Sequence, residues 1–178
     1  ETKTIAEAIS IQLVDAAHIL GAARVQMVVQ DGNRSVTIVF SGDIGSMDAP
    51  ILRDPVTPTP ADVVLLESTY GDHDHRPLDE ELLSILQEVQ RTGSKVVIPA
   101  FAVGRAQDLI FHIGEFLRGG QLKGMRVYLD TPMGSAVTAL YAKYTDIYDE
   151  RAKEILSQHM EPLRYPEFSY TESVEDSK

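Results

Sequence analysis

The sequence contains no cysteine and no tryptophan, and basic residues are scarce relative to acidic ones. Without cysteine there can be no disulfide bond, no thiolate nucleophile and no cysteine-based zinc site, so a metal would need histidine and carboxylate ligands. No apolar run has the length that a membrane-spanning helix needs. The first ten residues lack the basic and apolar regions of a secretory signal peptide. These absences predict a cytoplasmic protein that has no contact with a membrane.

The charge balance restricts the class of ligand. The chain has 27 Asp and Glu residues against 16 Lys and Arg residues, which gives a formal net charge of -11 over 178 residues. Such a surface repels nucleic-acid phosphates at long range, which argues against nonspecific binding driven by the overall charge. A nucleic-acid ligand would therefore need a local basic patch or a bound metal.

The first third of the chain has the pattern of a β-sheet. Alternating apolar residues predict a strand that begins the segment 9–18 and leads into a loop from Asp15 to Gly21. Two further β-rich runs, at 22–30 and 34–43, are separated by the turn sequence Asp-Gly-Asn and should form a hairpin. The segment 44–61 holds four prolines and has no periodicity, so we expect a surface connection with Ile51 and Leu52 turned inward.

The rest of the chain alternates between strand and helix patterns. Strands are predicted at 62–68, 95–101 and 126–130, and helices at 78–93, 104–120, 131–144 and 149–159. Three strands that are each followed by a helix favour a parallel sheet with right-handed crossovers. The predicted fold class is therefore α/β, with a β-rich portion at 1–61 joined to a parallel sheet flanked by helices at 62–178.

Several polar residues follow directly on these predicted strands, where ligands bind in open α/β sheets. Glu67, Ser68 and Thr69 end the first strand, Arg105 opens the helix after the second, and Thr131 can cap the helix after the third. Two helix N-termini beside Arg105 are compatible with an anion site. Every α/β domain has helix N-termini at this edge, so a purely structural role for Arg105 and Thr131 stays open.

The β-rich portion offers a second pair of candidates. His18 lies in the loop sequence DAAHILGAA, and Asp43 ends a strand in FSGDIG between Gly42 and Gly45. Imidazole and carboxylate groups are metal ligands, and glycines allow the tight backbone geometry that a ligand loop needs. Taken singly, His18 could equally be a hydrogen-bonded loop residue and Asp43 a turn former.

The order of these motifs resembles the β-CASP branch of the metallo-β-lactamase superfamily, a group of RNA-processing nucleases that includes RNase J and the cleavage and polyadenylation specificity factor endonuclease. DAAHILGAA and FSGDIG are similar to two ligand motifs of the metallo-β-lactamase core, and LLESTYGD is similar to motif A of the β-CASP insert. IPAFAVGRAQDLI and VYLDTPMGSAV resemble further insert segments. The similarity extends from about Ile11 to Ser177, and the ordered set is far more specific than any single motif.

This resemblance implies a division of the chain and a set of residue roles. Residues 1–61 would be the C-terminal portion of a metallo-β-lactamase αββα sandwich, and 62–178 an incomplete β-CASP insert. The full-length enzyme would hold two zinc ions, with His18 as a ligand of one and Asp43 bridging both. Asp43 and Glu67 would be catalytic, Glu67 by orienting a histidine. Single-stranded RNA would be the substrate.

The resemblance also implies that Ser68, Thr69 and Arg105 bind substrate phosphates. A homodimer is compatible with these assignments.

The sequence also departs from the family. The HxHxDH motif occurs nowhere in it, and GDHDHRP at 71–77 follows motif A instead, so His73 and His75 are interpreted as loop residues and not as ligands. We therefore expect a fragment that is inactive alone and binds metal weakly or not at all. The alternatives are a non-catalytic homologue that binds RNA or a partner, and a β-CASP nuclease that acts on DNA. A small-molecule lactamase is disfavoured, since those enzymes lack the ESTYGD segment.

Overall fold

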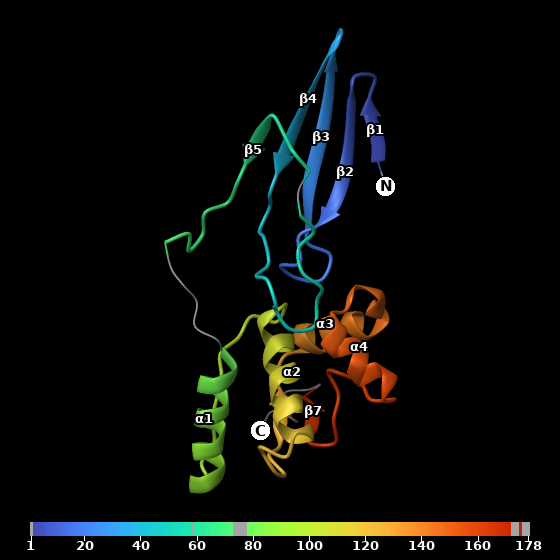
Figure 1. Cartoon of the computed structure of the whole chain (residues 1–178). Helices are drawn as coiled ribbons and strands as arrows, with labels where there is room; N and C mark the ends of the chain where they lie inside the picture. The colour runs from blue at the N-terminus through green and yellow to red at the C-terminus, as the bar shows by residue number, and fades with distance from the viewer. Residues whose placement is uncertain (1, 58, 73–77, 172–174, 176–178) are drawn as a thin grey trace. The chain divides into compact units, whose positions relative to one another are not determined.

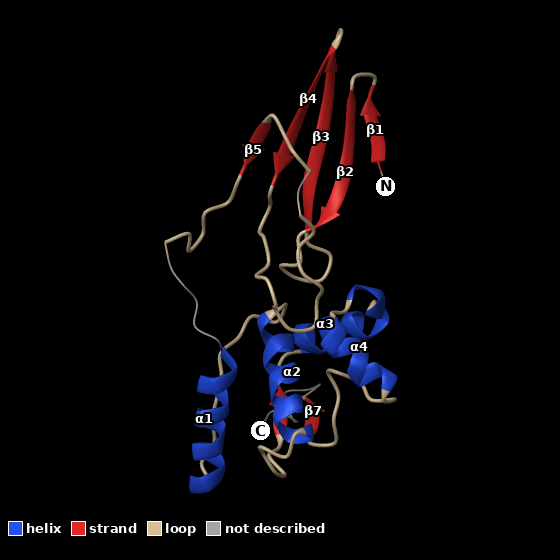
Figure 2. Ribbon diagram, viewed as in Figure 1, coloured by secondary structure: helices blue, strands red, loops and turns tan. Residues whose placement is uncertain are grey.

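The computed structural model describes residues 2–57, 59–72, 78–171 and 175. Their contacts divide the chain into two compact units, residues 1–74 and 75–178, and each unit is described by itself. Among the described residues, no helix combines the length and the apolar character needed to cross a membrane. The mixture of sheets and helices confirms the predicted α/β class (Figures 1 and 2).

The first unit is built on a five-stranded sheet in which the strands lie in their sequence order. The strands are β1 (Thr2–Ala6), β2 (Ile9–Asp15), β3 (Ala23–Asp31), β4 (Arg34–Phe40) and β5 (Val63–Leu65). The pairs from β1 to β4 are antiparallel, whereas β4 and β5 are parallel. The predicted hairpin of β3 and β4 is confirmed, because Asp31 pairs with Arg34 across the Asp-Gly-Asn turn.

The proline-rich connection between β4 and β5 is fastened to the sheet. Ile51 and Leu52 are buried, as predicted. The buried Arg24 of β3 donates a hydrogen bond to the backbone oxygen of Val56, and Thr59 donates to the Gln26 side chain at 2.7 Å. The described residues of the connection are therefore held against the sheet although they form no helix or strand.

The predicted strand at 62–68 forms in part, but in a different sheet from the expected one. β5 pairs with β4 in register Ile38–Val63 and so extends the sheet of the first unit. The apolar run of this strand is typical of a buried strand, yet Val63 and Val64 are 47% and 56% exposed. An edge strand with an uncovered face leaves its apolar side chains accessible.

The second unit contains four α-helices and a short parallel pair of strands. Its elements are α1 (Leu78–Thr92), α2 (Arg105–Arg118), β6 (Val127–Leu129), α3 (Pro132–Lys143), the 3-10 helix η1 (Thr145–Ile147), α4 (Glu150–Ser157) and β7 (Phe168–Tyr170). All four predicted helices are confirmed. The Thr131 side chain caps α3, and α1 is followed directly by Gly93, whose φ of 68° only glycine adopts freely.

The predicted three-stranded parallel sheet is not present in this unit. The structure assigns no strand to 95–101, and among the described residues β6 pairs only with β7, in a parallel arrangement. The apolar run at 96–98 looks like a buried strand in the sequence, yet Val97 is 89% exposed. An apolar pattern forms a strand only where a neighbouring strand supplies hydrogen bonds, and none lies alongside this segment in the described part of the unit.

Candidate functional site

Three of the predicted site residues follow strands that run in the same direction. β2 and β4 are each antiparallel to β3, and β5 is parallel to β4, so β2, β4 and β5 end at the same edge of the sheet. His18 lies three residues after β2, Asp43 three residues after β4, and Glu67 two residues after β5. The strand topology therefore brings all three residues to one edge of the first unit.

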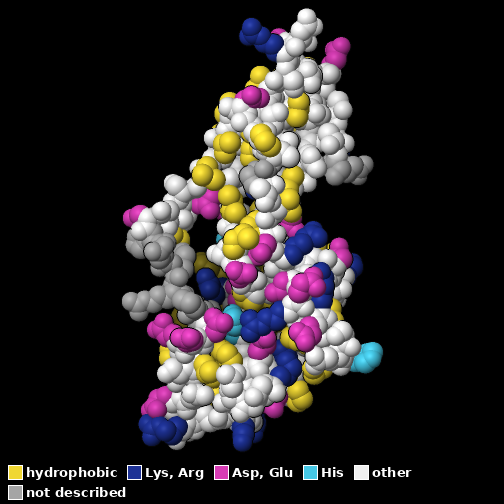
Figure 3. Space-filling view, viewed as in Figure 1, with side chains coloured by type: hydrophobic (Ala, Val, Ile, Leu, Met, Phe, Trp, Pro, Cys, Tyr) yellow, Lys and Arg dark blue, Asp and Glu magenta, His cyan; other side chains and the backbone are white. Residues whose placement is uncertain are grey.

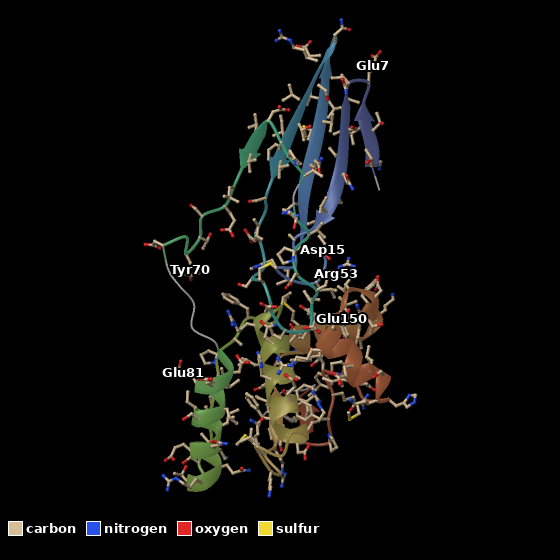
Figure 4. The ribbon with its side chains drawn as sticks, in the orientation of Figure 1. Glu7, Asp15, Arg53, Tyr70, Glu81 and Glu150 are labelled. Atoms are coloured by element: carbon tan, nitrogen blue, oxygen red, sulfur yellow. The ribbon has the colours of Figure 1, made fainter. Side chains whose placement is uncertain are left out.

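The loop that carries His18 is held in a fixed conformation by Asp15. The Asp15 carboxylate accepts a hydrogen bond from the Ala17 backbone N–H at 3.0 Å and forms an ion pair with Arg53 at 3.1 Å (Figure 4). Ala17 has a φ of 54°, in the left-handed region, and both Ala16 and Ala17 are buried. The buried alanines anchor the loop and leave the side chain of His18 exposed to solvent.

The loop that carries Asp43 interlocks with the His18 loop at Gly45. The Gly45 N–H donates a hydrogen bond to the Ala16 carbonyl oxygen at 2.8 Å. A Cβ at position 45 would overlap the carbonyl group of Ala17 and lie 2.9 Å from the His18 backbone nitrogen. Only glycine permits this approach, which keeps the exposed Asp43 on a loop in direct contact with that of His18.

Glu67 joins the same network through its carboxylate. One oxygen accepts from the Thr69 N–H at 2.8 Å and the other from the Ile44 N–H at 3.5 Å, beside Asp43. Hydrogen bonds from the Thr69 backbone and side chain, then the Ile44 N–H and the charge of His18, lower the pKa of the Glu67 carboxyl below its ordinary value. Glu67 is therefore ionised at neutral pH, and its oxygens keep lone pairs free for another donor.

Ser41 connects the ends of β4 and β5 beneath this site. Its side chain is buried, accepts a hydrogen bond from the Glu67 N–H at 2.9 Å and donates to the Gly42 carbonyl oxygen at 2.7 Å. The Ser41 N–H in turn donates to the Leu65 carbonyl oxygen at 2.9 Å. One residue thus fixes the spacing between the backbone next to Asp43 and the backbone of Glu67.

The donor set fits part of a zinc coordination sphere. One imidazole and one carboxylate, both exposed and carried by interlocked loops, are ligand types that zinc accepts. Among the described residues, no group of three or more His, Asp or Glu side chains is arranged to hold a metal ion. A catalytic zinc ion usually has three protein ligands, so His18 and Asp43 would need donors in addition to themselves.

The other predicted site residues have different positions. Ser68 and Thr69 are exposed and continue from Glu67 in the first unit. Arg105 is the exposed first residue of α2 and belongs to the second unit, whereas His18, Asp43 and Glu67 belong to the first. His73 and His75 lie outside the described residues.

The beginning of α2 is tied to α3 by a buried glutamine. Gln107 accepts a hydrogen bond from the Gly104 N–H at 2.8 Å and donates to the Thr138 hydroxyl of α3 at 3.0 Å. The Gly104 N–H is one of the backbone donors expected to contribute to an anion site, and the Gln107 side chain already accepts its hydrogen bond. Arg105 therefore projects from a helix N-terminus at which one backbone N–H is already hydrogen-bonded within the protein.

Three positioning residues, Asp15, Ser41 and Arg53, were not found by the sequence analysis. The pair of Arg53 and Asp15 spans 38 residues, and the bond between Glu67 and Ser41 spans 26. Local patterns contain no information on such pairs. The one available signal was Asp15 followed by two alanines, since aspartate side chains often bond to the backbone two residues later.

Comparison with known proteins places the chain in a family. Residues 106–178 match the model of the Beta-Casp domain. The chain is 38% identical over 174 residues to a ribonuclease of Thermus thermophilus, an alignment that covers 96% of the chain and 39% of the relative. It is 32% identical over 169 residues to an RNase J-like protein of Methanocaldococcus jannaschii, covering 92% of the chain and 39% of the relative.

A third relative comes from a eukaryote. The chain is 29% identical over 143 residues to cleavage and polyadenylation specificity factor 73 of Drosophila melanogaster, an alignment that covers 78% of the chain and 20% of that protein. The chain thus spans about two fifths of the length of the first two relatives, and less of the third. Together with the domain match, these similarities show that the chain belongs to the β-CASP family of metallo-β-lactamase-fold proteins.

Proposed function

We propose that this chain supplies part of the metal site and part of the RNA-binding surface of a zinc-dependent ribonuclease. The observation that carries the proposal is the interlock at Gly45, which keeps the loops of His18 and Asp43 in contact. The similarity to a ribonuclease and to an RNase J-like protein supports RNA as the substrate. The reaction would be hydrolysis of an RNA phosphodiester bond.

His18 and Asp43 would hold the metal, His18 as a ligand of one zinc ion and Asp43 as a bridge between two. When bound, a pair of zinc ions lowers the pKa of a coordinated water and offsets charge that develops on the phosphate. The chain contributes orientation: the Asp15 carboxylate fixes the His18 loop, and Ser41 fixes the backbone beside Asp43. Neither ligand loop is free to move without breaking a hydrogen bond to its neighbour.

Glu67 would act as an anionic acceptor that orients an imidazole. Its lowered pKa keeps it ionised, so it is unsuited to donate a proton at neutral pH. A carboxylate that accepts the N–H of a histidine fixes the ring orientation and the tautomer, and it makes the other ring nitrogen more basic. We assign this positioning role to Glu67 and assign no metal contact to it.

Ser68, Thr69 and Arg105 would bind backbone phosphates. The Ser68 hydroxyl and N–H follow Glu67 directly, and the Arg105 guanidinium offers up to five donors to phosphate oxygens. The Thr69 N–H and hydroxyl bond to the Glu67 carboxylate, so Thr69 would contact a phosphate only by exchanging that bond. All three side chains are exposed. Their contribution would be to hold the RNA strand in register with the metal site.

The chain alone is expected to be inactive. His18 and Asp43 are two ligands, whereas catalytic zinc usually takes three from the protein. The test compares the isolated chain with a chimera in which it replaces the aligned segment of the Thermus ribonuclease. Both are incubated with zinc and end-labelled single-stranded RNA, and with DNA of the same sequence.

We expect no cleavage by the chain and RNA cleavage by the chimera, which falls at least about 100-fold in the variants His18→Ala and Asp43→Ala. A matched control is His159→Gln, which alters an exposed histidine of the second unit. A folded, zinc-loaded chimera that binds RNA without cutting it would favour the non-catalytic alternative. Preferential cleavage of DNA would favour the DNA nuclease, and cleavage by the chain alone would contradict the proposed ligand count.

A further inference from the structure

Basic residues are concentrated in two segments of the second unit. The segments 89–107 and 116–129 contain six Lys and Arg residues and no Asp or Glu, in a chain whose formal net charge is -11. The first segment runs from the end of α1 to the start of α2, and the second from the end of α2 through β6. Positive charge is therefore gathered locally in a chain whose acidic residues are in excess elsewhere.

A hydrogen bond brings the two segments together. The Gln90 side chain, in the last turns of α1, donates to the Lys123 carbonyl oxygen in the loop after α2. Figure 3 shows Lys and Arg side chains at this tip of the second unit, over the end of α1 and over that loop. The exposed cations of the tip that have no ion-pair partner among the described residues are Lys95, Lys123 and Arg126, which we call the basic tip.

Both segments have a fixed conformation at this tip. After α1, Gly93 adopts a φ of 68° and the Ser94 N–H donates to the Val89 carbonyl oxygen at 3.1 Å. The backbone immediately before Lys95 is therefore held against the end of the helix. In the other segment Leu122 is buried, and its N–H donates to the Phe116 carbonyl oxygen at 3.1 Å. The cations are therefore presented by anchored backbone.

Helix stabilisation does not account for all three cations. A positive side chain in the last turn of a helix interacts favourably with the helix dipole, and Arg91 and Arg118 are placed for this role. That effect falls off within one turn. Lys123 and Arg126 lie five and eight residues after the end of α2, beyond its reach.

We propose that the basic tip is an RNA-backbone contact separate from Ser68, Thr69 and Arg105. The inference rests on the proposed function, because RNA is the polyanion that a ribonuclease must collect. The overall negative charge repels RNA, so an RNA strand would be attracted to a place where the local charge is positive. Binding to phosphates needs cations and no apolar contact. Val96 and Val97 beside Lys95 are 40% and 89% exposed, so the experiment also includes an acidic polypeptide as a competitor.

The test measures binding of fluorescein-labelled single-stranded oligouridine to the chain by fluorescence anisotropy, in EDTA and over a range of salt concentrations. The variant carries Lys95→Gln, Lys123→Gln and Arg126→Gln. The matched control carries Lys3→Gln, Arg34→Gln and Lys143→Gln, three exposed cations outside the tip. All six side chains are exposed, and circular dichroism verifies that both variants fold.

Three phosphate contacts to a single strand contribute a slope of about -2 to log affinity against log salt, or about a 20-fold loss of affinity for a fourfold rise in salt. We expect the tip variant to lose this component and to bind at least about tenfold more weakly at low salt, while the control triple binds like the unmodified chain. EDTA removes any metal contribution, and the same effect is expected in the background of His18→Ala.

Equal affinity and salt slope for the tip and control variants would overturn the proposal. Equal competition by a poly-glutamate peptide would assign the tip to acidic polypeptides, and no RNA binding at all would also refute it. Cleavage by the chimera is tested separately with the variants of His18 and Asp43. If the tip variant binds RNA normally and the chimera still cleaves RNA, the basic-tip proposal fails and the ribonuclease proposal stands.

Discussion

The interlock at Gly45 makes the substitution Gly45→Ala the sharpest perturbation of the site. The added Cβ would overlap the Ala17 carbonyl group and lie 2.9 Å from the His18 backbone nitrogen, closer than Cβ atoms approach in folded proteins. The obstacle is backbone, which cannot rotate away as a side chain would. The loops of His18 and Asp43 must therefore separate.

The cost follows from two effects. Separation breaks the 2.8 Å hydrogen bond from the Gly45 N–H to Ala16, and leaving such a buried pair unsatisfied costs about 1–3 kcal/mol. Forcing a methyl group into a packed site costs a further 1–3 kcal/mol or so. Partial relaxation offsets some of each, and we expect a loss of about 2–4 kcal/mol in the free energy of unfolding of the first unit.

The measurement is urea-induced unfolding followed by NMR of the amides of the first unit. Gly32→Ala is the matched control: Gly32 has a φ of 57° but no atom within 4 Å of an added Cβ, so only backbone strain of about 1–2 kcal/mol is expected. Gly45→Ala should shift the amide resonances of Ala17 and His18, and Gly32→Ala should not. If Gly45→Ala is as stable as the unmodified chain and leaves the His18 amide unshifted, the interlock is refuted.

Three further predictions concern single side chains. Ser41→Ala leaves the Glu67 N–H without its acceptor and should cost about 1–3 kcal/mol in urea unfolding. Ser35→Ala, at an exposed position of β4, should change stability by less than about 0.5 kcal/mol. Glu67→Gln should lower RNA cleavage by the chimera about 10- to 100-fold with unchanged zinc content, and an equal loss of zinc would contradict its positioning role. Burial lowers the pKa of His112, with Asp79 opposing and Arg151 adding to the shift, so protonation favours the unfolded state. Stability should fall as the pH drops below about 6.5, by at most about 1.4 kcal/mol per pH unit, and this dependence should disappear in His112→Phe but persist in His159→Gln.

Local sequence patterns predicted the elements whose causes are local. The Asp-Gly-Asn turn between β3 and β4, the apolar stripe of α1 and the cap of α3 by Thr131 are each decided by residues within a few positions of one another. The helices and the hairpin of β3 and β4 were therefore predictable, as was the class of fold.

Pairings between distant segments were not predictable in the same way. The run at 62–68 has the same apolar character whether it joins β4 or a separate sheet, and only the partner strand decides. The segment 95–101 shows the converse, since its pattern indicates a strand but no neighbouring strand pairs with it in the described part of the chain. β1 and β7 were missed because their short sequences carry too few residues for a clear period.

In the candidate site, too, some residues were predictable from local sequence and others were not. His18, Asp43 and Glu67 could be singled out because each follows a strand in a motif with a recognisable order. The residues that hold them, Asp15, Ser41 and Arg53, act through bonds between segments that are far apart in the sequence. Ligand candidates are visible in a sequence, whereas the network that orients them requires coordinates.

The most direct test is a zinc titration of the isolated chain, followed by NMR of the ring nitrogens of its five histidines. We expect the His18 ring to respond first, with weak affinity, and the response to be lost in Asp43→Ala. A zinc response confined to His73 and His75, with His18 unaffected, would contradict this expectation.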